Sequence, residues 1–147
     1  MLTKCAKILI SENDLKVKIK EVAEQITADY QGEEVLFVGI LKGCIHFYSD
    51  LTREVNLPLT MDFMAISSYG SGTTSSGEVK MLKDLDKSIC GKNVIIVEDI
   101  IDTGRTLNDV VNLLKGRNLM AFLHALLGII WLFIAKIEID EDKEKND

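Results

Sequence analysis

The chain has 147 residues, of which 47% are hydrophobic, and a formal net charge of −6. This size and composition fit one folded domain. Residues 137–147 hold six acidic residues against two lysines, so the rest of the chain is nearly neutral and lacks the broad basic surface of a nucleic-acid-binding protein. The cysteines, Cys5, Cys44 and Cys90, show no CxxC spacing, and lysines interrupt the apolar residues at the N-terminus. We therefore expect no zinc knuckle, disulfide framework or signal peptide, and a cytoplasmic protein that binds a small phosphorylated ligand.

The first two predicted elements are a helix and a buried strand. Ser11 followed by Asp14 resembles a helix start, and the helix is predicted to end at Gly32. One face of this helix carries apolar residues at helical spacing: Leu15, Ile19, Val22, Ala23, Ile26 and Tyr30. The continuous apolar run 35–40 is typical of a strand that is buried on both faces.

The next two elements repeat this order. Residues 44–55 predict a second helix, and Pro58 marks the break before a strand at 59–66. The inward side of that helix is predicted to consist of Ile45, Tyr48, Leu51, Thr52 and Val55. Residues 67–77, rich in glycine and hydroxyl side chains, predict a mobile loop.

The last predicted elements complete an alternation of strands and helices. Residues 79–85 predict a half-exposed strand, and 94–97 a buried strand that ends at Glu98 and Asp99. A helix on Leu107, Val110, Val111 and Leu114 then ends near Gly116. The expected fold class is α/β, a three-layer, mostly parallel sheet with helices on both faces and ligands at the carboxyl ends of its strands.

The segment from 97 to 106 carries the strongest chemical signal. A Thr103–Gly104 turn before a helix predicts a phosphate socket, because the first backbone N–H groups of a helix are unpaired and the hydroxyls of Thr103 and Thr106 add donors. Glu98 and Asp99, at a strand end, suit ribose hydroxyls or a magnesium ion bound to the ligand. The structural alternative is a capped helix with acidic residues near its positive end.

This segment, Val97–Thr106, resembles the phosphoribosyl-pyrophosphate loop of type I phosphoribosyltransferases, in the version of the hypoxanthine-guanine branch. Val38–Gly43 resembles the pyrophosphate loop of that branch, and Ser67–Gly70 the start of its flexible lid. The resemblance covers about residues 5–118. It implies the type I fold and the Mg²⁺-dependent transfer of 5-phosphoribosyl from its pyrophosphate to hypoxanthine or guanine, which is a step of purine salvage.

The resemblance also implies roles for individual residues. Asp102 would be the general acid/base at N7 of the purine, and Ser68 and Tyr69 would close over the reacting centre and exclude water. The peptide bond before Lys42 would often be cis. Glu98 and Asp99 would be the residues nearest to the metal. Phosphoribosyl pyrophosphate would be bound by Lys42, Gly43, Glu98, Asp99, Asp102, Thr103, Gly104, Arg105 and Thr106.

The resemblance ends near residue 118. The base-contacting lysine, the pyrophosphate-binding arginine and the aromatic residue of the family's hood are not recognisable after it, so we expect the hood to be missing or replaced. We divide the chain into a phosphoribosyltransferase core at 1–118, an apolar segment at 119–135 and a disordered acidic tail at 136–147. The apolar segment has three readings: replacement core at the sheet edge, a membrane anchor, or an aberrant end.

The expected partners are phosphoribosyl pyrophosphate, a purine base and further copies of the chain. No nucleic acid is expected, and a membrane is not an expected partner although the sequence does not exclude one. Two alternatives to the enzyme stay open. One is a phosphoribosyl-pyrophosphate or nucleotide-binding regulator, or an inactive truncated relative. The other is a membrane-tethered module. His46 and His124 stand alone and do not indicate a zinc site.

Overall fold

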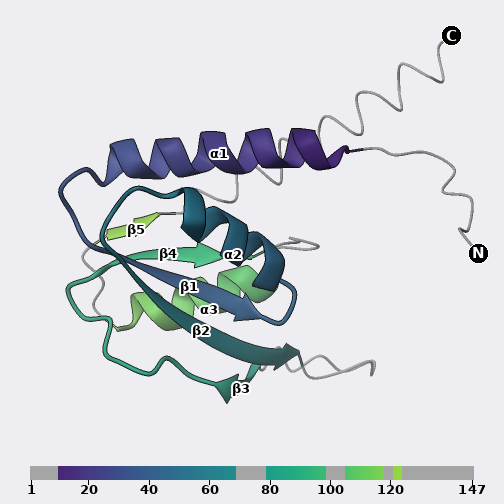
Figure 1. Cartoon of the computed structure of the whole chain (residues 1–147). Coiled ribbons are helices and arrows are strands. Elements are labelled where there is room, and N and C mark those ends of the chain that lie inside the picture. The colour runs from purple at the N-terminus through teal and green to yellow at the C-terminus, as the bar shows by residue number, and fades with distance from the viewer. Residues whose placement is uncertain (1–9, 69–78, 99–104, 118–120, 124–147) are drawn as a thin grey trace, which may run out of the picture.

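The computed structural model describes residues 10–68, 79–98, 105–117 and 121–123. The described elements follow the predicted alternation of helices and strands. They are α1 (Glu12–Asp29), β1 (Val35–Leu41), α2 (Ile45–Glu54), β2 (Leu59–Ser68), β3 (Val79–Lys83), β4 (Asn93–Val97), α3 (Arg105–Lys115) and β5 (Ala121–Leu123). The strands form one five-stranded sheet in the order β3-β2-β1-β4-β5 (Figure 1). All neighbours in this sheet are parallel except β2 and β3, so the mostly parallel α/β fold is confirmed.

Helix α1 begins at the predicted cap. The Ser11 hydroxyl accepts a hydrogen bond from the Asp14 backbone N–H at 3.0 Å, and the Asp14 carboxylate accepts one from the Ser11 N–H, which together form a capping box. Ile19 and Ile26 of the predicted apolar face are buried, but Leu15 is 46% exposed. Leu15 lies in the first turns of α1, whose start extends past the described end of α2 (Figure 1).

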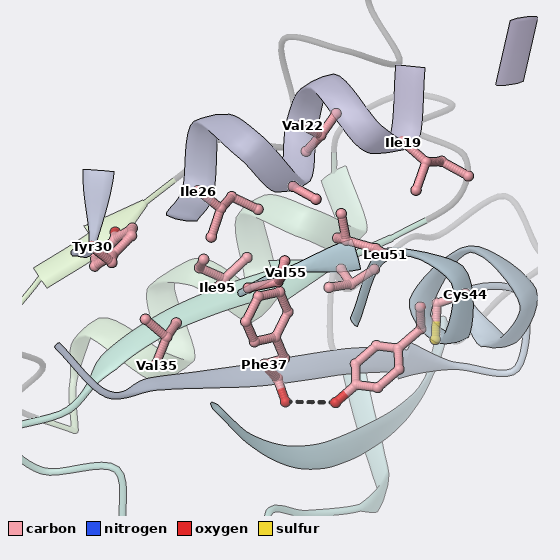
Figure 2. Packing of buried hydrophobic residues seen from close by; sticks show 13 residues of the cluster. Ile19, Val22, Ile26, Tyr30, Val35, Phe37, Cys44, Leu51, Val55 and Ile95 are labelled. Atoms are coloured by element: carbon pink, nitrogen blue, oxygen red, sulfur yellow. Dashed lines mark hydrogen bonds between the residues drawn. The ribbon is translucent and has the colours of Figure 1, made fainter. Parts of the chain in front are cut away.

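Strand β1 is buried on both faces because helices cover each face. One apolar cluster joins α1 and α2 to the β1 side chains Val35 and Phe37 (Figure 2). The other joins α3 to the alternate β1 side chains, Leu36, Val38 and Ile40. A side chain that is fully buried in such a cluster contributes about 1.5–3 kcal/mol. The two clusters therefore fix the helices on opposite faces of the sheet.

The inward side of α2 agrees with the prediction except at its start. Tyr48, Leu51 and Val55 are buried, whereas Ile45 is 45% exposed. Ile45 is the first residue of α2, next to the turn that leaves β1. Its side chain is therefore not a member of the apolar cluster.

A buried carboxylate, which the sequence did not predict, connects β2 to the chain beyond β3. Asp62 accepts hydrogen bonds from the backbone N–H groups of Phe63, at 2.7 Å, and Asp86, at 2.8 Å. The Lys83 Nζ atom lies 3.5 Å from the same carboxylate and donates to the Phe63 carbonyl at 3.0 Å. These partners compensate the cost of burying a charge and fix β2 against the β3–β4 connection.

Residues 121–123 of the apolar segment form β5, which pairs with β4 at one edge of the sheet. The three readings of the segment, which are replacement core at the sheet edge, a membrane anchor and an aberrant end, stay open. The rest of the segment and the predicted acidic tail lie outside the described residues, and the division of the chain at residue 118 stays a prediction. Within the described ranges, no helix is both long and apolar enough to span a membrane.

The ion pair between Asp84 and Arg117 ties the end of α3 to the β3–β4 connection. Its two hydrogen bonds measure 2.8 and 2.9 Å, and the Arg117 guanidinium lowers the pKa of the Asp84 carboxyl. This carboxylate thus stabilises the fold above its unfolded pKa, and the contribution disappears as the pH falls through its lowered folded pKa. We expect Asp84→Asn to lower the melting temperature slightly at pH 7, and the difference from the wild type to shrink as the pH falls below about 4 and to vanish once the pH is below the lowered folded pKa of Asp84. Thermal unfolding across this range, with the exposed Glu24→Gln as control, tests it; a difference that persists at acid pH would contradict it.

Candidate functional site

The chain topology brings several predicted site residues to one edge of the sheet. Helix α2 connects the parallel strands β1 and β2, and α3 connects the parallel strands β4 and β5. Each helix therefore begins at the carboxyl edge of the strand before it. Because β1 and β4 are neighbours and their helices lie on opposite faces, the strand order reverses between them. In open α/β sheets, ligands bind outside the carboxyl ends of the strands at this switch point.

The Lys42–Gly43 turn occupies the carboxyl end of β1. The peptide bond between Leu41 and Lys42 is cis, as the resemblance implied. The Lys42 carbonyl accepts a hydrogen bond from the Ile45 N–H at 3.2 Å, which closes the turn at the first residue of α2. Lys42 and Gly43 are exposed. Among the residues that the structure describes, no carboxylate forms an ion pair with the Lys42 ammonium group.

Gly39 explains how α2 can approach β1 closely enough to hold this turn. A Cβ atom on Gly39 would lie 2.8 Å from Cδ2 of Tyr48, 2.9 Å from Cδ1 of Phe63 and 3.0 Å from Sγ of Cys44. The site residues predicted from the sequence did not include Gly39. The sequence feature that could have identified Gly39 is a glycine inside a buried strand, because such a glycine often marks the close approach of another segment.

Glu98 lies next to this turn on the neighbouring strand. Gly39 of β1 pairs with Val97 of β4, so Glu98, one residue later, follows β4 at the same edge. Its side chain is half-buried. A carboxylate oxygen at this position can accept hydrogen bonds from ribose hydroxyls or bind a hard cation.

The start of α3 lies at the same edge, on the other face of the sheet. Arg105 and Thr106 are the first two residues of the helix, and its inward residues Val110, Val111 and Leu114 are buried against the sheet. The backbone N–H groups of a first helical turn attract anions.

Ser68 is the last residue of β2. It lies three residues beyond Ala65, which pairs with Leu41 of β1, so β2 ends at the same edge of the sheet.

The structure thus brings together Lys42, Gly43, Glu98, the end of β2 at Ser68, and the start of α3 at Arg105 and Thr106. The other predicted site residues lie outside the described residues; they are Tyr69, Asp99, Asp102, Thr103 and Gly104. In the described part of the chain, no group of three metal-ligating side chains lies together.

The sequence of residues 9–145 matches the family model of the phosphoribosyl transferase domain. The chain belongs to the phosphoribosyltransferase family. The cis peptide bond before Lys42 is the one that the resemblance to this family implied.

Similar proteins carry the names of the hypoxanthine-guanine branch. The chain is 53% identical over 111 residues to the bifunctional protein TilS/HprT of Listeria innocua, covering 76% of this chain and 17% of that protein. It is 51% identical over 111 residues to the hypoxanthine-guanine phosphoribosyltransferase of Streptococcus pyogenes, covering 76% of this chain and 62% of the relative. The crystal structure of a hypoxanthine phosphoribosyltransferase from Staphylococcus aureus matches with a TM-score of 0.75 and 45% identity, covering 79% of this chain and 63% of that one. The matched part thus spans less than two thirds of the length of each of these relatives.

Proposed function

We propose that this phosphoribosyltransferase moves 5-phosphoribosyl from phosphoribosyl pyrophosphate to hypoxanthine or guanine, which yields IMP or GMP and pyrophosphate. The observation that supports the proposal is the switch point between β1 and β4, because the Lys42–Gly43 turn, Glu98 and the start of α3 all follow the carboxyl ends of these two strands. The names of the similar proteins support the choice of purine.

In the proposed reaction, each part of the edge binds one part of the substrate. The Lys42 ammonium group and the backbone of its turn bind the pyrophosphate. The 5'-phosphate lies against the first turn of α3, where Thr103, Gly104 and Thr106 follow the pattern of a phosphate socket. Glu98 and Asp99 accept hydrogen bonds from the two ribose hydroxyls between these phosphate sites.

Glu98 and Asp99 fit Mg²⁺ by the chemistry of their donors. Carboxylate oxygens are the ligands that Mg²⁺ takes, and proteins usually supply one or two of them while substrate phosphates supply others. The ion would neutralise charge on the leaving pyrophosphate. The protein's own contribution is to orient the ribose and, through Asp102, to take the proton that leaves N7 of the purine.

The test is nucleotide formation by the purified chain with phosphoribosyl pyrophosphate, Mg²⁺ and either hypoxanthine or guanine. We expect both IMP and GMP to form, and EDTA to abolish turnover until excess Mg²⁺ is added. A folded chain that forms neither nucleotide would refute the proposed activity.

A second candidate function is binding of phosphoribosyl pyrophosphate or nucleotide without turnover. It is favoured by the sequence after residue 118, in which the hood residues are not recognisable. Calorimetric binding of phosphoribosyl pyrophosphate without nucleotide formation would select it over the enzyme.

We also infer that the chain acts in the cytoplasm as a homo-oligomer. Cys44 and Cys90 are free thiols, which suits a reducing compartment. Light scattering coupled to gel filtration will measure the mass of the particle. A single mass of 16.4 kDa would contradict the oligomer.

Lys42→Ala tests the proposed pyrophosphate contact. Hydrogen bonds to a charged group contribute about 1.5–3 kcal/mol, so we expect the KM for phosphoribosyl pyrophosphate to rise roughly 10- to 100-fold. The KM for the purine should change little. Lys20→Ala, which removes an exposed lysine of α1, serves as the matched control. Equal effects of the two substitutions would show that Lys42 does not contact the substrate.

A further inference from the structure

Tyr48 joins helix α2 to two strands of the sheet. Its side chain is 1% exposed, and its ring lies against the Phe63 ring with centroids 4.6 Å apart. Its hydroxyl donates to the Phe37 carbonyl of β1 at 2.9 Å, the dashed line in Figure 2. The Asp62 carbonyl of β2 lies 3.4 Å from the same hydroxyl. One side chain thus sets the position of α2 against both β1 and β2.

The hydroxyl remains a hydrogen-bond donor at every physiological pH. Burial raises the pKa of Tyr48 well above that of a free tyrosine, because ionisation would place a negative charge in the apolar cluster. A phenol in this state donates one hydrogen bond. The shorter contact, to Phe37, is therefore the one that fixes the ring.

The strand beneath Tyr48 is itself held in place. The Phe63 N–H donates to the Asp62 carboxylate, and the Phe63 carbonyl accepts from Lys83 at 3.0 Å. The Asp62 carboxylate also accepts from the Asp86 N–H. Tyr48 therefore rests on a part of β2 whose backbone and side-chain polar groups are bound to the β3–β4 connection.

Two backbone hydrogen bonds lead from Tyr48 to the Lys42 turn. The Tyr48 N–H donates to the Cys44 carbonyl at 2.7 Å, and the Ile45 N–H donates to the Lys42 carbonyl at 3.2 Å. Because these bonds join the first turn of α2 to the end of β1, a shift of Tyr48 moves the turn. Gly39 leaves the space that the Tyr48 ring needs for this arrangement.

We propose that Tyr48 is a positioning residue, whose hydroxyl anchors α2 to β1 and thereby holds the Lys42–Gly43 turn where the pyrophosphate group of the substrate binds. The inference rests on the proposed function of that turn. Tyr48 touches no substrate atom and acts through the backbone of α2. Loss of the Tyr48 hydroxyl should therefore weaken the binding of the pyrophosphate group at the end of β1. The binding of the 5'-phosphate at the start of α3 should stay unchanged.

The test compares Tyr48→Phe with Tyr30→Phe, since both tyrosines belong to the same apolar cluster and Tyr30 lies at the far end of α1. Loss of one neutral hydrogen bond predicts a rise of about fivefold in the KM for phosphoribosyl pyrophosphate and in the calorimetric Kd for inorganic pyrophosphate with Mg²⁺. The Kd for IMP and the kcat should stay within about twofold of the wild type. Tyr30→Phe should leave all four values unchanged.

Two results would overturn the inference alone: wild-type pyrophosphate affinity in Tyr48→Phe, or an equal loss of affinity for pyrophosphate and IMP, which indicates only general destabilisation. A wild-type chain that neither forms nucleotide nor binds pyrophosphate would overturn the proposed function and this inference with it. Should Tyr48→Phe not fold, Phe63→Leu removes the ring contact and retains the hydroxyl and its bond to Phe37. That variant should keep pyrophosphate affinity within about twofold of the wild type, and a selective loss of about fivefold in it would show that the ring contact, not the hydroxyl, positions the turn, which would overturn the inference.

Discussion

Asp102→Ala is expected to lower kcat by roughly 10²- to 10⁴-fold, the usual contribution of a positioned general acid/base. Asp102 stands three residues before α3 and four after Glu98, in the segment that connects β4 to α3 at the carboxyl edge of the sheet. Its proposed work is to take the proton from N7 as the glycosidic bond forms, and this interaction is made mainly in the transition state. The Kd for phosphoribosyl pyrophosphate should therefore change by only a few fold.

The measurement pairs steady-state kinetics with calorimetry on the same preparations. Asp102→Asn keeps the size and hydrogen-bonding capacity of the side chain but cannot take a proton, so its kcat should fall nearly as far as that of Asp102→Ala. Asp50→Ala removes an exposed carboxylate from α2 and should leave kcat unchanged. If binding falls in proportion to kcat, Asp102 is a binding residue and another group moves the proton.

The elements of this fold were predictable where a local pattern sufficed. The apolar runs of β1 and of β4 after Asn93 carry the signature of strands covered on both faces. The Ser11–Asp14 pair marks the start of α1 in the sequence as it does in the structure. Periodicity misplaced Ile45, and it did not foresee that Leu15 is exposed, because it reports which residues share a helix face and not how far the neighbouring layer extends along the helix.

Contacts between distant segments could not be predicted in this way. Asp62 sits in a strand pattern that gives no sign of a buried carboxylate, and its partners Lys83 and Asp86 come more than twenty residues later in the chain. The bond from Tyr48 to the Phe37 carbonyl likewise depends on how α2 packs over β1. The Lys42 turn could be predicted because its motif is continuous, whereas the side chains that hold it are assembled by packing.

Gly39→Ala is expected to destabilise the fold and weaken pyrophosphate binding together. The added Cβ would lie within 3.0 Å of atoms of Tyr48, Phe63 and Cys44. These distances are shorter than van der Waals contact, so the neighbouring atoms would have to move. Tyr48 and Cys44 are buried and belong to α2 and its cap, so they can yield only if the helix moves away from β1. Overpacking of this kind costs about 1–3 kcal/mol of the free energy of unfolding.

The matched control is Gly116→Ala, because a Cβ at Gly116 would meet only the Leu113 and Asn112 carbonyls at 3.5 and 3.9 Å, which are ordinary contacts. Urea unfolding should show a lower midpoint for Gly39→Ala with an unchanged slope, and a midpoint close to the wild type for Gly116→Ala. Since α2 carries the Lys42 turn, Gly39→Ala should also raise the Kd for pyrophosphate more than the Kd for IMP. Wild-type stability in Gly39→Ala would show that α2 has room to retreat, and that the close approach at Gly39 does not determine the position of the turn.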